Sequence, residues 1–220
     1  MLAGLFINVY SFLALVSIIH FGCWYEFVKL MKKTHDAFSF LHLVVGILYI
    51  TLPLAAFVAL SLSPVMPKMS LISLVDYMSS ALIYFSPLLP IIIILAIWTN
   101  DTMAYIAGSL IGKTPFSPIS PKKTWEGTIG GIVLCTLVMT ILGYLLPIGQ
   151  ALALKHWVAF AAIAAITGTI GDLFESKLKR NAGVKDSGTF MPGHGGFLDR
   201  FDSLLFAAPA IWMYVQIFLS

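Results

Sequence analysis

The residue types that could do chemistry are concentrated in one short stretch, residues 172 to 202. Of the 23 charged residues in the 220-residue chain, ten lie in these 31 positions, together with His194 and several glycines. Long apolar runs flank the stretch, and no charged residue follows it. Acids, bases and glycines gathered inside an otherwise apolar chain indicate that something polar and highly charged binds here, and metal with phosphate is the simplest candidate.

The first group in this stretch is Asp172, Glu175, Ser176 and Lys179. Spacings of three and four residues place all of them on one face of a helix. An alternative is a solvated helix end with ordinary ion pairs. The preceding run, residues 161–171, is rich in small apolar residues that allow helices to pack closely. We therefore expect this face to point into a helix bundle.

The second group is a pair of acids, Asp199 and Asp202, which share a face if their segment is helical. Asp172 and Asp199 lie on either side of a glycine-rich loop that can bring them together. Facing carboxylates repel each other unless a cation lies between them. Magnesium suits such a site, because it prefers oxygen ligands and shares phosphate oxygens with its substrate.

Glycines at 193, 195 and 196 surround His194. Successive N–H groups of a glycine loop can form a nest for an anion, although an ordinary loop is the alternative. The nearby Lys185 and Arg200, with the acids beside them, favour a phosphate site. His194 alone is a weak metal candidate, because a single histidine more often donates a hydrogen bond or packs.

A second basic element covers residues 113–127 and contains Lys113, Lys122 and Lys123. Positive-inside topology alone would explain these charges. The prolines and serines of the segment favour a further role, and Thr124 can cap the following helix, whose N-terminal end attracts phosphate. Asp101 lies inside an apolar run, and an acid within a membrane span indicates a functional site. The alternative is that Asp101 pairs with a lysine of a neighbouring helix.

The composition is that of an integral membrane protein. The chain is 59% hydrophobic and 10% charged, with a mean hydropathy of +0.94, whereas soluble domains carry about 25% charged residues. Its length fits one membrane domain. Cys23 and Cys135 lie in apolar runs, so we expect small core residues rather than a disulfide or a zinc site. The apolar N-terminus reads as a retained helix, not a signal peptide.

Apolar runs predict an all-α, polytopic helical bundle. Six runs are long enough to cross a bilayer: 2–28, 39–62, 87–111, 125–147, 153–171 and 203–219. Three lysine and arginine clusters should face the cytoplasm, so an even number of spans must separate Lys33 from Lys113. We therefore expect residues 71–86 to form a short interfacial or re-entrant helix, and both termini to lie outside. Residues 1–86 supply N-terminal helices and 87–220 the catalytic helices and cytoplasmic loops.

Spaced motifs in the second half resemble the phosphatidate cytidylyltransferases, also called CDP-diacylglycerol synthases. The main one is Ser176-x-Leu178-Lys179-Arg180, four residues, Lys185-Asp186, then Pro192-x-His194-Gly195-Gly196-x-x-Asp199-Arg200-x-Asp202. Three further segments also resemble the family: Trp98-Thr99-Asn100-Asp101-Thr102-x-Ala104-Tyr105, Gly112-Lys113, and Ser120-Pro121-Lys122-Lys123-Thr124-Trp125-Glu126-Gly127. A weaker N-terminal element of the family resembles Trp24-Tyr25-Glu26-Phe27. The chain is shorter than the familiar bacterial enzymes, which leads us to expect fewer N-terminal helices.

The resemblance implies that CTP and phosphatidate react to give CDP-diacylglycerol and pyrophosphate. It implies Asp172 and Asp199 as metal ligands, with two roles open for Asp202: a further ligand or a partner that positions Arg200. The contacts it implies for the triphosphate are Lys113, Lys122, Lys123 and Arg180. Those for the lipid phosphate are Lys179, Lys185 and Arg200, with a hydrogen bond from His194. The substrate-binding set also includes Ser176, Gly195, Gly196 and Asp101, the last beside the nucleotide or ordering a lysine.

The resemblance also implies the surroundings of the reaction. We expect Mg²⁺ as cofactor, with a second, monovalent cation such as K⁺ as an option. The expected partners are CTP, phosphatidate, the lipid bilayer and a second copy of the chain in a homodimer, but no nucleic acid. The expected location is a cell membrane, the inner membrane of a bacterium, crossed several times with the active-site loops in the cytoplasm.

Other functions compete with this interpretation. A sibling enzyme could act on another lipid phosphate or, as a CTP-dependent kinase, on a polyprenol. Buried acids also serve ion or phosphate transporters, but these commonly carry inverted repeats, and the sequence shows none. An inactive homologue would be expected to have lost part of the signature, which is intact.

Overall fold

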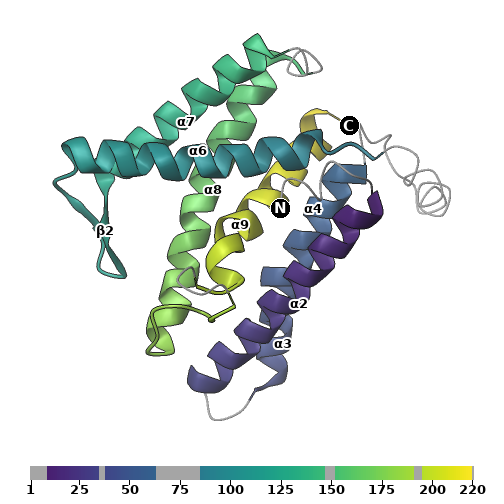
Figure 1. Cartoon of the computed structure of the whole chain (residues 1–220), viewed down its shortest axis with the longest axis vertical. Helices are drawn as coiled ribbons and strands as arrows, with labels where there is room; N and C mark the ends of the chain where they lie inside the picture. The colour runs from purple at the N-terminus through teal and green to yellow at the C-terminus, as the bar shows by residue number, and fades with distance from the viewer. Residues whose placement is uncertain (1–8, 35–37, 63–84, 147–151, 191–194, 220) are drawn as a thin grey trace.

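The computed structural model describes residues 9–34, 38–62, 85–146, 152–190 and 195–219 (Figure 1). The elements are α2 (Val9–Thr34), α3 (Phe40–Gly46), a π-helical turn η1 (Ile47–Thr51), α4 (Leu52–Leu62), α6 (Leu88–Ile111), β1 (Pro115–Ser117), β2 (Ser120–Thr124), α7 (Trp125–Leu145), α8 (Leu154–Asn181) and α9 (Leu198–Phe218). Six helical segments in these ranges are long and apolar enough to cross a membrane, with α3, η1 and α4 together forming one of them. This confirms the predicted polytopic all-α class.

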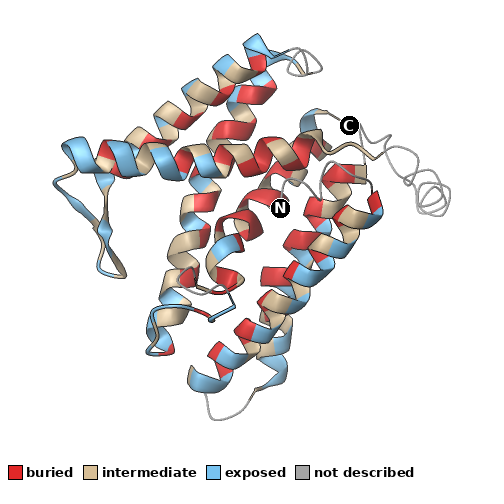
Figure 2. Ribbon diagram, viewed as in Figure 1, coloured by how far each residue is buried: buried red, intermediate tan, exposed pale blue. Residues whose placement is uncertain are grey.

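The helices are arranged around the α8–α9 pair (Figure 1). The N-terminal α2 lies beside α3 and α4 on one side of α9. In the view of Figure 1, α6 crosses the upper half of α8, and α7 meets α8 at its upper end. Figure 2 shows buried residues gathered where α8, α9, α4 and α2 face one another. This interior holds the fully buried Phe12, Phe27, Phe57, Phe160 and Leu205.

Close contact between α8 and α9 depends on small residues. α8 buries Ala161, Ala164, Ala165 and Gly168 within the bundle. A Cβ atom placed on Gly171 would collide with the backbone carbonyl of Asp202 in α9. The two helices therefore approach closely beside the acids that follow Gly171, as the small-residue run predicted.

The outer surface is suited to lipid. Along one face of α7 the side chains of Ile129, Val133, Leu137 and Ile141 are exposed, whereas Gly131, Cys135 and Met139 on the opposite face are buried. Exposed aliphatic side chains in a continuous stripe are expected of a helix that contacts hydrocarbon rather than water.

Three helix boundaries differ from the predicted spans because charged residues continue the helices. α2 includes Lys29, Lys32 and Lys33, which were expected to end it. α8 continues ten residues past Gly171 and α9 begins at Leu198 rather than 203, so both carry the signature acids. Lysine, arginine and glutamate are good helix formers, so a change from apolar to charged sequence need not end a helix. The predicted helix at 71–86 lies almost wholly outside the described residues.

A short antiparallel hairpin, which was not predicted, connects α6 to α7. β1 pairs with β2, with Pro115 opposite Thr124 and Ser117 opposite Ser120. Strands of three and five residues rich in proline, serine and lysine have no alternating apolar pattern, which is why they read as a loop. The hairpin extends from the ends of α6 and α7 (Figure 1). Its Lys122 and Lys123 line the same cavity as the signature acids.

Candidate active site

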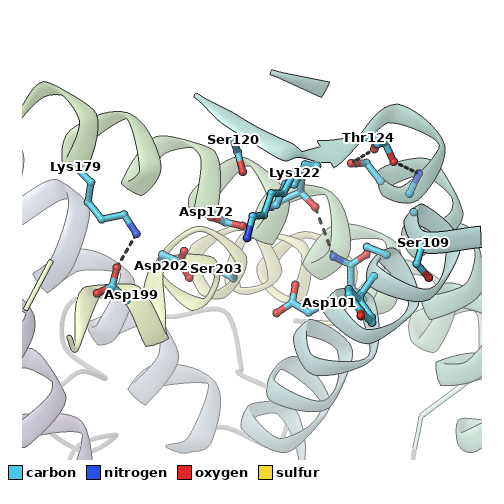
Figure 3. A pocket seen from close by; sticks show the side chains of 18 residues that line it. Asp101, Ser109, Ser120, Lys122, Thr124, Asp172, Lys179, Asp199, Asp202 and Ser203 are labelled. Carbon is cyan, nitrogen blue, oxygen red and sulfur yellow. Dashed lines mark hydrogen bonds and ion pairs between the residues drawn. The ribbon is translucent and has the colours of Figure 1, made fainter. Parts of the chain in front are cut away.

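A polar cavity of about 570 Å³ lies between α6, the hairpin, the start of α7, and the α8–α9 pair. Figure 3 shows Lys179 and Asp199 at one end, Asp101 and Ser109 at the other, and Asp172 and Asp202 between them. Its polar lining comprises Asn100, Asp101, Tyr105, Ser109, Ser120, Lys122, Lys123, Thr124, Thr128, Thr169, Asp172, Lys179, Asp199, Asp202 and Ser203. Pockets of about 300–1,000 Å³ hold small-molecule ligands, so a nucleotide is of suitable size.

The hairpin lysines reach this cavity because both ends of the hairpin are fixed. Thr124 caps α7, as predicted: its side chain accepts a hydrogen bond from the Gly127 backbone N–H at 3.1 Å. Glu126 accepts hydrogen bonds from the backbone N–H groups of Lys113 and Thr114 at 3.1 Å. Lys122 and Lys123 project from the anchored β2, and the Lys123 ammonium forms an ion pair with Asp172.

Three acids on α8 and α9 converge beside the cavity. Asp172, Glu175 and Asp202, which we call the carboxylate cluster, each offer an oxygen within 4.8 Å of the others. Asp172 accepts a hydrogen bond from Ser176 Oγ at 3.3 Å, and Asp202 from the Ser203 backbone N–H at 2.6 Å. Glu175 is fully buried, and its Oε2 lies 2.5 Å from Lys179 Nζ. Clustered carboxylates of this kind fit a hard cation that prefers oxygen ligands.

Asp199 is held differently, at what we call the Asp199 end of the cavity. Its Oδ1 accepts a hydrogen bond from Lys179 Nζ at 2.6 Å. Its Oδ2 accepts hydrogen bonds from the Gly196 N–H at 2.7 Å and from the Ser187 backbone N–H at 2.9 Å, and the Ser187 hydroxyl oxygen lies 2.9 Å away. Gly195 has φ +81, which favours glycine, and a Cβ atom there would collide with Asp199. The protein itself therefore satisfies this carboxylate.

Comparison with known proteins places the chain in a family. The model of the cytidylyltransferase family matches residues 55–218. The chain belongs to the cytidylyltransferase family. It is 35% identical to the phosphatidate cytidylyltransferase of Thermotoga maritima, over 96% of the chain and 90% of that protein.

Other family members match shorter parts of the chain. It is 41% identical to a phosphatidate cytidylyltransferase of Helicobacter pylori, over 58% of the chain and 50% of that relative. The chloroplastic phosphatidate cytidylyltransferase 4 of Arabidopsis thaliana is 45% identical over 53% of the chain and 29% of that relative. The chain thus spans about half the length, or less, of several curated family members.

The cavity brings together seven of the fifteen predicted site residues. Seven predicted residues line it: Asp101, Lys122, Lys123, Asp172, Lys179, Asp199 and Asp202. Three more contact these acids without lining the cavity, namely Ser176, Gly195 and Gly196. The assignment of individual roles to these residues stays a prediction.

Other predicted residues lie away from the cavity in the described part of the chain. The side chains of Lys113, Lys185 and Arg200 are exposed and do not line it. Arg180 donates a hydrogen bond to the Val184 carbonyl at 3.2 Å instead. His194 lies outside the described residues.

Sequence reasoning left three residues of this site without a role. Glu175 was placed on the same helical face as Asp172 but given no function. The Ser187 backbone N–H donates to Asp199, and nothing in the local sequence marks this residue. Glu26 in α2 accepts a hydrogen bond from Ser187 at 2.7 Å. Glu26 could have been predicted as a site residue, because it is an acid within an apolar span, which is the feature that singled out Asp101.

Proposed function

We propose that this family member transfers the CMP group of CTP to phosphatidate. A phosphate oxygen of phosphatidate attacks the α-phosphorus of CTP. The bond from that phosphorus to the oxygen of the β-phosphate breaks, and pyrophosphate leaves, so CDP-diacylglycerol and pyrophosphate are the products. The observation that carries the proposal is the polar cavity, in which Lys122, Lys123 and Lys179 meet the signature acids inside a bundle of apolar helices.

The lysines suit a reaction between two anions. CTP and phosphatidate are both negatively charged, so their approach requires cations that offset the repulsion. Catalysis of phosphoryl and nucleotidyl transfer consists mainly of positioning and charge stabilisation, which fixed ammonium groups provide. Phosphatidate is already ionised at neutral pH, so no strong base is required. We assign Lys122 and Lys123 to the triphosphate and Lys179 to the reacting phosphates.

The carboxylate cluster is our proposed Mg²⁺ site. The observation in its favour is the convergence of Asp172, Glu175 and Asp202, of which Glu175 is fully buried and already paired with Lys179 through one oxygen. Asp199 was predicted as a ligand, but its oxygens accept three hydrogen bonds from N–H donors of the protein, which favours Asp202 as the partner of Asp172. A divalent cation there would neutralise charge on the reacting phosphates.

The membrane setting suits a lipid substrate. The chain is a multi-pass membrane protein, and its outer helical faces are apolar. Phosphatidate would enter between helices from the bilayer, with its phosphate at the level of the cavity. We place the hairpin and the loop after α8 in the cytoplasm, where CTP is found, following the distribution of lysine and arginine.

The direct test is pyrophosphate release by the protein purified in detergent. We expect release to require CTP and phosphatidate together, with CDP-diacylglycerol as the lipid product. Diacylglycerol, which lacks the phosphate, serves as the matched control acceptor and should release none. Formation of CDP from CTP and diacylglycerol would instead indicate a kinase, and no reaction with phosphatidate by well-folded protein would contradict the proposal.

A further inference from the structure

Glu26 is a buried acid far from the signature in sequence and in contact with it in space. It lies in α2 and is only 3% exposed. Its carboxylate accepts three hydrogen bonds: from Ser187 Oγ at 2.7 Å, from the Phe197 backbone N–H at 2.9 Å and from the Leu198 backbone N–H at 3.0 Å. A buried carboxylate is costly unless hydrogen bonds satisfy it, and all three donors here come from the signature segment.

Two of these donors belong to the start of α9. The first N–H groups of a helix have no partner within the helix, and they carry partial positive charge. Phe197 is the N-cap residue of α9 and Leu198 its first residue, so Glu26 caps α9 from another helix. Room for the carboxylate is made by two glycines, because a Cβ atom at Gly188 or Gly196 would collide with it.

The contact continues from Glu26 into the cavity through Ser187. The Ser187 hydroxyl lies within hydrogen-bonding distance of Glu26 Oε2 at 2.7 Å and of Asp199 Oδ2 at 2.9 Å. Asp199 in turn holds the Lys179 ammonium at 2.6 Å, at the cavity wall. Only Ser187 and Asp199 therefore separate Glu26 from a cation that lines the cavity.

We propose that Glu26 is a positioning residue for this cavity: it fixes the start of α9 and Ser187, and through them orients Asp199 and Lys179. The N-terminal helix α2 thereby completes the site, although the family model matches only residues 55–218. The effect on catalysis rests on the function proposed above, whereas the effect on the order of the loop does not.

A competing explanation is that Glu26 only anchors α2 to the bundle. Thr51 in η1 provides a matched control for anchoring. Its Oγ1 accepts a hydrogen bond from Trp24 Nε1 at 3.0 Å and lies 3.0 Å from His20 Nε2, so it also holds α2 but has no contact with the signature loop among the described hydrogen bonds. Thr51→Val removes these contacts at nearly constant volume.

The first experiment compares Glu26→Gln with Thr51→Val in the pyrophosphate-release assay, with thermal unfolding in detergent measured for both. Glutamine keeps the size of Glu26 but turns an N–H group towards donors. We expect Glu26→Gln to lower kcat by about 10- to 100-fold with a smaller change in KM, because displacement of a catalytic group by about 1 Å can cost 100-fold. Thr51→Val should stay near wild type. Unchanged kcat in Glu26→Gln, or equal losses in both variants at equal loss of stability, would overturn the proposal.

The second experiment does not depend on the substrate. Hydrogen–deuterium exchange should quicken in Glu26→Gln for peptides that contain Phe197 and Leu198, whose amides lose their acceptor, while peptides from α6 keep the wild-type rate. Unchanged exchange at Phe197 and Leu198 would overturn the positioning role. If the wild type releases no pyrophosphate, the proposed function fails, and this measurement alone decides the role of Glu26.

Discussion

The two parts of the cavity that hold acids are built differently. At the Asp199 end, the carboxylate accepts hydrogen bonds from Lys179 and from the backbone N–H groups of Gly196 and Ser187. In the carboxylate cluster, the oxygens of Asp172, Glu175 and Asp202 converge on one another. A carboxylate satisfied by protein donors is held rigidly, whereas converging carboxylates repel one another, and the ion pairs of Asp172 with Lys123 and of Glu175 with Lys179 offset only part of that repulsion. One part is thus prearranged by the fold, and the other is suited to an added ion.

The largest effect is expected from Asp172→Asn and Asp202→Asn. If the cluster binds the cation, losing one ligand removes several kcal/mol of charge stabilisation, which corresponds to about 10³-fold or more in rate. Pyrophosphate release at saturating Mg²⁺ measures this. Asp186→Asn is the matched control, because this acid is exposed and outside the cavity. Nearly full activity in either cluster variant would contradict a cation site in the carboxylate cluster, and with it the contrast to the Asp199 end.

Lys179→Met should have the next largest effect. Lys179 lines the cavity and pairs with both Glu175 and Asp199, so its loss leaves the buried Glu175 and the partly buried Asp199 without their shared cation. We expect a loss of about 10²-fold in kcat, similar to removal of one preorganised electrostatic group. Lys177→Met, two residues earlier on an exposed part of α8, should remain near wild type. Equal losses in the two variants would show that the total positive charge at the C-terminal end of α8 matters, rather than the ion pairs of Lys179 with Glu175 and Asp199.

Lys123→Met tests the hairpin side of the carboxylate cluster. Its ammonium pairs with Asp172, so we expect it to hold the triphosphate beside that acid. Loss of one charge-assisted contact, about 1.5 kcal/mol, should raise the KM for CTP by about tenfold. Lys113→Met removes a lysine whose side chain lies outside the cavity and should change the KM little. A larger effect from Lys113 would restore the predicted role of that residue at the triphosphate.

The smallest effect is expected from Thr124→Ala. This variant removes the cap of α7 and should lower the free energy of unfolding by about 1 kcal/mol, with only a modest change in activity. Chemical denaturation in detergent measures the difference. Thr136→Val, which removes a hydroxyl that donates only within α7 to Ile132, is the control and should be nearly neutral. An effect of Thr136→Val as large as that of Thr124→Ala would contradict the capping role.

The sequence predicted the part of the site that follows from helical spacing. Asp172 and Lys179 share a face of α8, and Asp199 and Asp202 lie on α9, because residues three or four apart are neighbours on any helix. The six spans of the described residues followed from apolar length, and the cap followed from the Thr124 side chain. Each of these features depends on residues close together in the chain.

The rest depends on contacts between distant segments. Nothing local links Glu26 to Ser187 and Leu198, which are more than 160 positions away in sequence. The choice of Asp199 as a metal ligand relied on its motif position, whereas its hydrogen bonds depend on how the loop turns at Gly195 and Gly196. The hairpin was not predicted either, because its short strands have no alternating apolar pattern. Hydrogen bonds to Glu126 and Thr124 position them instead.

Direct binding of a divalent ion tests the contrast between the two parts best. Mn²⁺ prefers the same oxygen ligands as Mg²⁺, and electron paramagnetic resonance reports its binding to the purified protein without any turnover. We expect Asp172→Asn and Asp202→Asn to weaken Mn²⁺ binding by about 100-fold or more, since even outer partners of a metal site contribute 10- to 100-fold. Asp199→Asn should retain wild-type affinity. Loss of Mn²⁺ binding in Asp199→Asn, with wild-type binding in Asp202→Asn, would contradict this contrast.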